Sequence, residues 1–153
     1  MRHLRVGIIS DTHGLLRNEV IDILKTCDYI IHGGDICGPE ILDTLTMIAP
    51  VFVVRGNNDK GTWALDLKKE ETFQIGGLHF YMVHDKGDVR KDLSGIHVVI
   101  YGHSHKYAEE QRQNILWLNP GSCGKRRFRL PLSMAIMDIK DMKYEVKQVS
   151  IEG

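Results

Sequence analysis

Residues 4–35 read LRVGIISDTHGLLRNEVIDILKTCDYIIHGGD, and the pattern within this stretch decides the fold. Two short apolar runs, 6–9 and 29–31, each end in a polar cluster, and between them apolar residues recur at helical spacing over 16–24. The stretch therefore predicts a strand, a helix and a second strand, with Asn18 as the N-cap of the helix. Strands that are apolar on both faces are typical of a parallel sheet covered on both sides.

The same alternation continues to residue 59. Gly38-Pro39 indicates the start of a second helix, because proline suits the first helical turn. The run 51–54 predicts a third strand, which again ends in a polar cluster. Right-handed crossovers would make the three strands parallel, and the binding sites of such sheets gather at the carboxyl ends of the strands. We therefore expect the polar clusters to meet at one edge of this sheet.

The remainder of the chain predicts further strands. Apolar residues alternate on either side of Gly76-Gly77, which predicts a hairpin whose two glycines supply positive φ. The runs 98–101 and 115–118 have the apolar character of buried strands. A terminal hairpin is predicted over 132–139 and 144–151.

The apolar phase of the last predicted strand breaks between Val146 and Val149, which leaves its register open. No repeat, linker or low-complexity tract divides the sequence. We therefore expect a single domain over 1–153, of the α/β class, in which two packed mixed β-sheets form a sandwich with helices outside.

Composition argues against several classes of function. The chain has 153 residues, with 20 Lys plus Arg against 20 Asp plus Glu, so no strong positive field is expected and no stable nucleic-acid complex is predicted. No apolar stretch approaches the ~20 residues of a membrane span, and no secretory signal is recognisable. Cys27, Cys37 and Cys123 form no CxxC pair and are predicted to be free thiols, which favours the cytoplasm.

Five polar clusters stand at the ends of predicted strands. They are Asp11-Thr12-His13, Gly34-Asp35, Gly56-Asn57-Asn58-Asp59, His84-Asp85 and Gly102-His103-Ser104-His105. Their carboxylate and amide oxygens and imidazole nitrogens suit Mn²⁺, Fe, Zn²⁺ or Ni²⁺ better than Ca²⁺. If strand geometry persists, Asp-x-His and His-x-His aim both side chains at one place, because residues i and i+2 share a face. Seven donors exceed the needs of one tetrahedral ion and favour two ions that share a carboxylate.

Each cluster alone has a simpler interpretation. An Asp at a strand end is often a turn former, and a His beside a strand is more often a hydrogen-bonded core residue, as we predict for His32. The ordered set of five differs, because chance does not readily place every cluster where a parallel sheet builds its site. The set as a whole therefore indicates a metal site.

The order of these motifs resembles the calcineurin-like metallophosphoesterase superfamily, and within it the branch of small single-domain phosphodiesterases. The resemblance runs from Asp11 to the segment Asn119-Pro120-Gly121-Ser122, which is typical of that branch. It implies a first metal held by Asp11, His13 and His105. It implies a second metal held by Asn57, His84 and His103, with Asp35 bridging the two. The fold it implies is a β-sandwich flanked by helices.

The resemblance also implies an activity. We expect a dinuclear phosphoesterase, more specifically a phosphodiesterase, in which a metal-bridging hydroxide attacks phosphorus while the ions neutralise the developing charge. Mn²⁺ is the expected ion, with Ni²⁺, Fe, Zn²⁺ and Co²⁺ as alternatives. The expected partner is a small phosphoester, with nucleotides among the candidates, and homo-oligomerisation stays open.

Two positions depart from the superfamily pattern. Many members have Gly-Asn-His, whose His is thought to help protonate the leaving group, whereas this chain has Asn58, which cannot act as an acid. We therefore predict a catalytic position at Asn58 that prefers diesters with good leaving groups, the alternative being a simple loop former. Asp85 follows His84 where Gly is common, and it either contacts a ligand or forms a turn.

A basic stretch follows the Asn-Pro-Gly-Ser segment. Arg126, Arg127 and Arg129 could bind a substrate phosphate, since guanidinium groups match phosphate oxygens. The alternative is a solvated basic surface, which is the commoner role of such clusters. The sequence leaves the two interpretations open.

Three rival functions fit the sequence less well. The retromer scaffold subunit shares the superfamily fold but acts through protein contacts with a degraded metal site, whereas all seven ligand positions here carry competent side chains. A metal amidohydrolase or lactamase would show His-x-His-x-Asp-His, which this sequence lacks. A nucleophilic Cys37 or Cys123 has no His and Asn partner pattern, and both are better explained as small packed residues.

Overall fold

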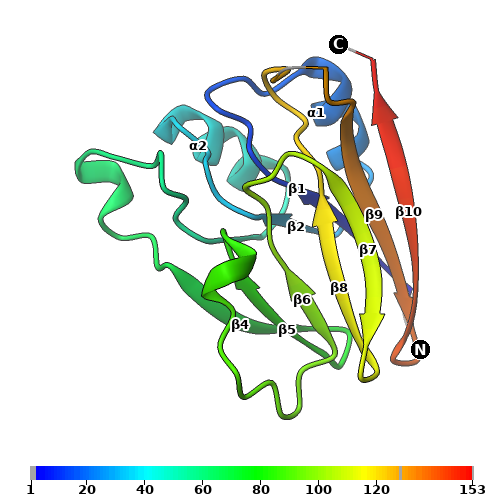
Figure 1. Cartoon of the computed structure of the whole chain (residues 1–153). Helices are drawn as coiled ribbons and strands as arrows, with labels where there is room; N and C mark the ends of the chain where they lie inside the picture. Colours follow the sequence, from blue (N-terminus) through cyan, green and yellow to red (C-terminus); the bar gives the residue numbers. More distant parts are fainter. Residues whose placement is uncertain (1–2, 128, 153) are drawn as a thin grey trace.

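The computed structural model describes residues 3–127 and 129–152, which form two five-stranded sheets packed face to face (Figure 1). The first sheet has the order β10 (Lys143–Ile151), β9 (Leu132–Lys140), β1 (Leu4–Ile9), β2 (Tyr29–His32), β3 (Val51–Val53). The second has the order β4 (Glu70–Ile75), β5 (Leu78–Val83), β6 (Val98–Ile100), β8 (Ile115–Pro120), β7 (Tyr107–Arg112). The helices are α1 (Asn18–Leu24) and α2 (Pro39–Ile48), with short 3₁₀ turns η1 (Thr62–Ala64) and η2 (Lys86–Asp88).

Both sheets mix parallel and antiparallel pairs, so the predicted fold class is confirmed. The strands β1, β2 and β3 are parallel neighbours, joined by crossovers through α1 and α2. The predicted hairpin at Gly76-Gly77 joins β4 and β5 in antiparallel register. In the second sheet, β5, β6 and β8 are parallel, so their carboxyl ends also meet at one edge.

The helix α1 begins one residue earlier than predicted. Asn18 is its first residue and Arg17 is the N-cap, with no side-chain hydrogen bond at that cap, so the predicted Asn18 N-cap is wrong. The backbone of Arg17 is still extended, at φ −72° and ψ 145°. The Arg17 side chain turns away to donate a hydrogen bond from Nε to the carbonyl oxygen of Gly124, at 2.9 Å.

Two apolar layers explain why β1 and β2 are apolar on both faces. One layer lies between the sheets, where Ile8 and Ile31 meet Phe80 and other residues of the second sheet. The other lies between the first sheet and the helices, where Ile9 and Leu45 belong to one cluster. The residues that form a continuous apolar run in sequence are therefore shared between two cores. This double burial fixes the positions of the strand ends that carry the polar clusters.

The phase break in the last strand arises without any slip in register. The strand β10 pairs continuously with β9 from Lys143 to Ile151. Tyr144 and Val146 pack against the layer between the sheets, whereas Val149 and Ile151 pack against the layer beneath the helices. The edge strand uses opposite faces in its two halves, which accounts for the change of phase.

The apolar pattern predicts no strand over 107–112, yet β7 forms there. The strand reads YAEEQR, and its last four residues are exposed, because it lies at the edge of the second sheet. It returns into β8 through Gln113 and Asn114, both with positive φ, of 50° and 67°. An edge strand with one polar face carries little apolar periodicity, so the pattern misses it.

The three cysteines Cys27, Cys37 and Cys123 are free thiols, as predicted. Within 3–127 and 129–152, no helix combines the length and the apolar character that a membrane crossing requires.

Candidate metal centre

The polar clusters follow β1, β2, β3, β5 and β6, and the backbone leaves strand geometry where they begin. Asp11, His13, Asp35, His103 and His105 all have positive φ, between 47° and 74°. Such values are uncommon for residues other than glycine and concentrate at functional sites. The expectation that strand alternation aims the i and i+2 side chains is therefore wrong. Left-handed backbone turns aim them instead.

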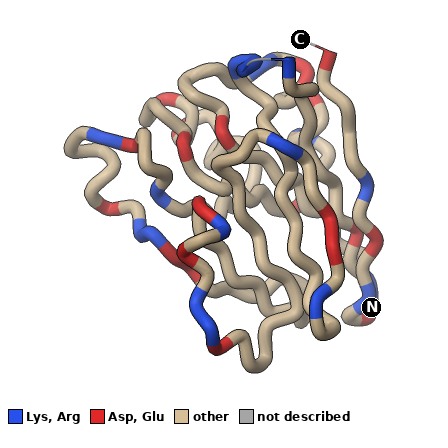
Figure 2. Tube along the Cα trace, in the orientation of Figure 1, with Lys and Arg blue, Asp and Glu red and all other residues tan. Residues whose placement is uncertain are grey.

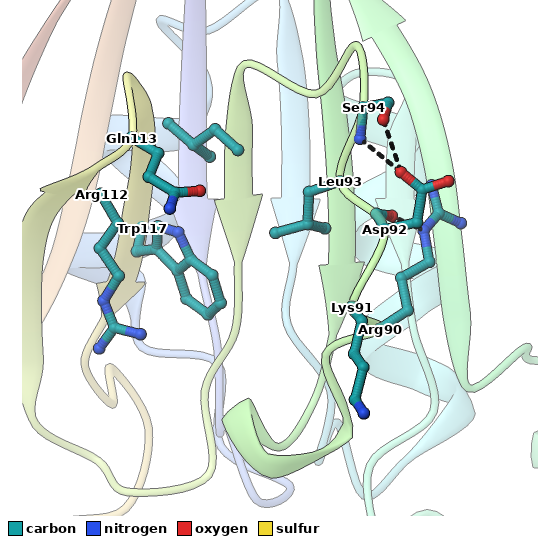
Figure 3. A pocket seen from close by; sticks show the side chains of 9 residues that line it. Arg90, Lys91, Asp92, Leu93, Ser94, Arg112, Gln113 and Trp117 are labelled. Atoms are coloured by element: carbon teal, nitrogen blue, oxygen red, sulfur yellow. Dashed lines mark hydrogen bonds between the residues drawn. The ribbon is translucent and has the colours of Figure 1, made fainter.

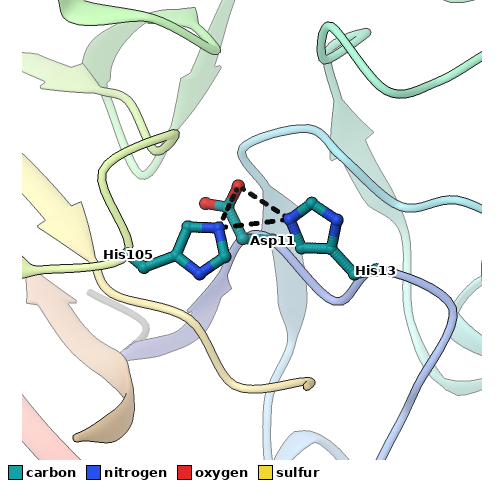
Figure 4. Close-up of side chains that lie close together, drawn as sticks. All are labelled: Asp11, His13 and His105. Atoms are coloured by element: carbon teal, nitrogen blue, oxygen red, sulfur yellow. Dashed lines mark hydrogen bonds and ion pairs between the residues drawn. The ribbon is translucent and has the colours of Figure 1, made fainter. Parts of the chain in front are cut away.

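A first group consists of Asp11, His13 and His105, which come from two loops and face one another (Figure 4). Oδ1 of Asp11 lies 3.6 Å from Nε2 of His13 and 3.5 Å from Nε2 of His105. The two Nε2 atoms are 3.2 Å apart. Ligand atoms of one first-row metal ion at about 2.1 Å stand roughly 3.0–3.5 Å from each other, so the spacing suits a shared cation.

The carboxylate of Asp11 is fixed through one oxygen and free at the other. Oδ2 accepts hydrogen bonds from Ser10 Oγ at 2.8 Å and from the backbone N–H of His103 at 3.0 Å. Oδ1 is fully buried and has no hydrogen-bond partner among the described residues. A buried carboxylate oxygen without a partner is costly, and a cation at this point would remove the cost.

A second group consists of Asp35, His84 and His103. Nε2 of His84 lies 3.3 Å from Oδ2 of Asp35, and it too is buried without a hydrogen-bond partner in the described part of the chain. Nδ1 of His84 donates to the carbonyl oxygen of Gly33 at 2.8 Å, which orients the ring toward Asp35. The same Oδ2 lies 3.5 Å from Nε2 of His13. Asp35 thus stands between the two groups.

The two asparagines after β3 take different places, Asn57 beside the second group and Asn58 against Asp35. Asn57 lines a pocket of about 180 Å³ together with His84 and His103. Asn58 donates its backbone N–H to Oδ1 of Asp35 at 2.8 Å and its Nδ2 to Oδ2 at 2.9 Å. Asn58 therefore donates a hydrogen bond to each oxygen of Asp35.

Asp59 is an organising residue to which the sequence assigned no role. Its buried carboxylate accepts hydrogen bonds from the backbone N–H groups of Asp35, Cys37 and Gly56, at 2.8–2.9 Å. These bonds tie the loop after β2 to the loop after β3. A Cβ on Gly56 would overlap Asp35, so the close approach requires glycine. The signal available in the sequence was an Asp three residues after a strand-end Gly.

His32 is a hydrogen-bonded core residue, as predicted. Its Nδ1 accepts from the N–H of Gly34 at 3.1 Å, so Nε2 carries the proton and donates to Oγ1 of Thr12 at 3.1 Å. Thr12 in turn donates to the carbonyl oxygen of Ile36. Burial lowers the pKa of His32 to about 4, which keeps the ring neutral.

Charges within the cluster reinforce one another. Burial opposes ionisation of Asp35, but the neighbouring His84 and the hydrogen bonds from Asn58 hold the pKa of Asp35 well below its ordinary value. Burial likewise opposes the charge on His84, but the carboxylates of Asp35 and Asp11 raise the pKa of His84 to about 9. Asp35 is therefore a carboxylate at neutral pH. A carboxylate between two imidazole-bearing groups, with buried unpartnered atoms on both sides, fits the donor set of divalent cations.

Residues 4–142 match the family model for the calcineurin-like phosphoesterase superfamily domain. The chain belongs to this superfamily. A probable metallophosphoesterase of Methanocaldococcus jannaschii is 36% identical over 163 residues, covering 96% of this chain and 81% of that protein. A phosphodiesterase of the same organism is 28% identical over 161 residues, covering 92% and 96%. The crystal structure of Vps29 complexed with zinc from Entamoeba histolytica superposes with a TM-score of 0.72 at 22% identity, covering 96% and 99%.

In this calcineurin-like phosphoesterase, two pockets of different charge flank the clustered side chains. One, of about 340 Å³, is lined by His13, Cys37, His105, Lys125, Arg126 and Arg127. The second pocket, which Asn57 also lines, has two cations and two carboxylates in its lining: Arg55, Lys69, Asp85 and Asp88. Arg129 is exposed and is not among the lining residues.

Asp85 is a turn residue that also lies near His103. Its Oδ1 accepts a hydrogen bond from the N–H of Gly87 at 3.0 Å, as a turn residue does. Its Oδ2 lies 3.9 Å from Nε2 of His103, so it also faces one of the clustered imidazoles.

A larger hollow lies elsewhere in this phosphoesterase, beside β8 (Figure 3). It measures about 710 Å³, and its lining includes Trp117, Leu93 and Arg90. Trp117 and Leu93 belong to the apolar cluster of Tyr81 and Val99, which is separate from the layer between the sheets. None of the seven predicted ligands lines this hollow.

Proposed function

We propose that this phosphoesterase is a dinuclear metal-dependent phosphodiesterase. In the proposed centre, Asp11, His13 and His105 hold one cation, Asn57, His84 and His103 hold the other, and Asp35 is shared. The observation that carries the proposal is the place of Asp35, whose Oδ2 is within 3.5 Å of imidazoles from both groups. Membership of the superfamily and the phosphodiesterase relative support the same activity.

The two cations, when bound, would supply Lewis acidity and an activated water for attack on phosphorus. The chain's own residues set up that chemistry. The carbonyl of Gly33 orients His84, the backbone of His103 fixes one oxygen of Asp11, and Asp59 holds the loop that carries Asp35. Preorganised ligands of this kind need no rearrangement when substrate enters.

Asn58 defines which esters are cleaved well. Its amide is bonded to Asp35 and has no acidic proton, so no acid at this position assists departure of the leaving group. Leaving groups of low pKa depart without such help. The proposed substrates are therefore small phosphodiesters with good leaving groups, nucleotides among them, and Mn²⁺ is the first cation to test.

The test compares metal-loaded wild type with Asp35→Asn on bis-p-nitrophenyl phosphate. The substitution keeps the size of the side chain but removes the shared charge, so we expect kcat to fall at least about a thousandfold. His79→Ala is the control, since His79 is exposed and lies outside both groups. Hydrolysis that is absent from wild type with every divalent ion, or unchanged in Asp35→Asn, would favour a non-catalytic scaffold like the retromer subunit.

A further inference from the structure

We propose that Lys125, Arg126 and Arg127 bind a second phosphoryl group of the substrate, beside the one that is cleaved. The inference rests on the proposed function and names its substrate class, which is a small phosphodiester with an additional phosphate or phosphonate on one arm. We refer to these three residues as the basic loop.

The first observation concerns the residues that surround the basic loop. It shares a pocket with His13 and His105 of the first group, and that pocket has three cations and no carboxylate in its lining. None of the three cations forms an ion pair with any residue in 3–127 or 129–152. The pocket on the opposite side mixes cations with carboxylates. Of these two pockets, the one beside the first group is thus the one with cations and no carboxylate in its described lining.

The second observation is that the segment before the basic loop is fixed to the loop of Asp11 and His13. Ser122 Oγ donates to the carbonyl oxygen of Asp11 at 2.9 Å. The carbonyl of Gly124 accepts from Arg17 Nε at 2.9 Å. A Cβ on Gly124 would overlap the backbone of Thr12, so only glycine permits this contact. The basic loop therefore directly follows a segment that is held against the loop of Asp11 and His13.

The basic loop lies close to the proposed ligands, because one pocket is lined by Arg126 and Arg127 together with His105. Figure 2 shows Lys and Arg gathered at the top of the view, where the chain passes after β8. Guanidinium and ammonium groups bind phosphate oxygens through charge-assisted hydrogen bonds. With the cleaved phosphoryl group at the cations, a second one on the arm toward His13 would meet the basic loop.

Matched substrates test the proposal. One series is p-nitrophenyl phosphodiesters with a phosphonoalkyl arm of short, medium or long linker, and the other has a hydroxyl in place of the phosphonate. For at least one linker we expect wild type to show a kcat/KM about tenfold higher for the phosphonate. The ratio should fall toward one in the double variant Arg126→Gln with Arg127→Gln. Arg129→Gln, which changes an exposed arginine outside the pocket, should keep the wild-type ratio.

A binding experiment separates this inference from the proposed function. Calorimetry on metal-loaded protein should show an alkyl bisphosphonate binding about tenfold more tightly than the matching alkyl monophosphonate, with the difference lost in the double variant. That result without turnover of any ester would refute the phosphodiesterase and keep the phosphoryl site. A ratio near one for every linker and equal affinities in wild type would overturn the basic-loop proposal, as would an unchanged preference in the double variant.

Discussion

The two candidate cation groups differ in how deeply the protein encloses them. In the first group, the side chain of His105 is only 3% exposed and that of Asp11 is fully buried. In the second, the side chain of His103 is 47% exposed and faces Asp85 across a pocket of mixed charge. Asp11 of the first group closely follows the core strand β1, whereas the second group includes the exposed loop residue His103. The proposed centre thus combines a more enclosed group with a more exposed one.

This difference predicts unequal affinities for the two cations. We expect His105→Ala to weaken binding of one ion about a hundredfold and His103→Ala to weaken binding of one ion about tenfold, because the exposed position is more readily replaced by water. Competition with a chelator, followed by elemental analysis of the retained metal, measures both losses. His79→Ala serves as the matched control. Equal losses, or a larger loss for His103→Ala, would break the comparison.

A smaller change in activity is expected from a substitution at Asn58, which contacts the Asp35 that the two groups share. Asn58→His places an acid beside Asp35 and should raise the ratio of monoesterase to diesterase activity about threefold to tenfold. The ratio is measured with p-nitrophenyl phosphate and bis-p-nitrophenyl phosphate on the same preparation. Asn114→His, in the turn between β7 and β8, controls for the added imidazole. An unchanged ratio in Asn58→His would show that this position does not contribute to departure of the leaving group.

Most of the fold could be predicted because buried strands have a recognisable apolar pattern in the sequence. The runs that became β1 and β2 are apolar throughout, since each packs against a core on both faces. The edge strand β7 has no such apolar pattern, because its last four residues are exposed. The phase break between Val146 and Val149 could not be explained from sequence, because the two residues pack against different apolar layers.

The residues of the candidate site could be predicted from sequence, whereas the backbone conformations that bring them together could not. The motifs indicated which side chains gather, but no pattern predicts that Asp11 and His103 adopt positive φ. The role of Asp59 was hidden because its partners are backbone N–H groups of other loops. The basic loop depends on contact between Gly124 and Thr12, which are far apart in sequence, so its place beside His13 could not be read from spacing.

The central claim is that Asp35 is shared by two cations, and anomalous X-ray diffraction from manganese-soaked crystals tests it most directly. We predict two peaks, one touching Asp11, His13 and His105 and the other touching Asn57, His84 and His103, with Asp35 in contact with both. A single peak, or two peaks with Asp35 bound to only one of them, would contradict the account.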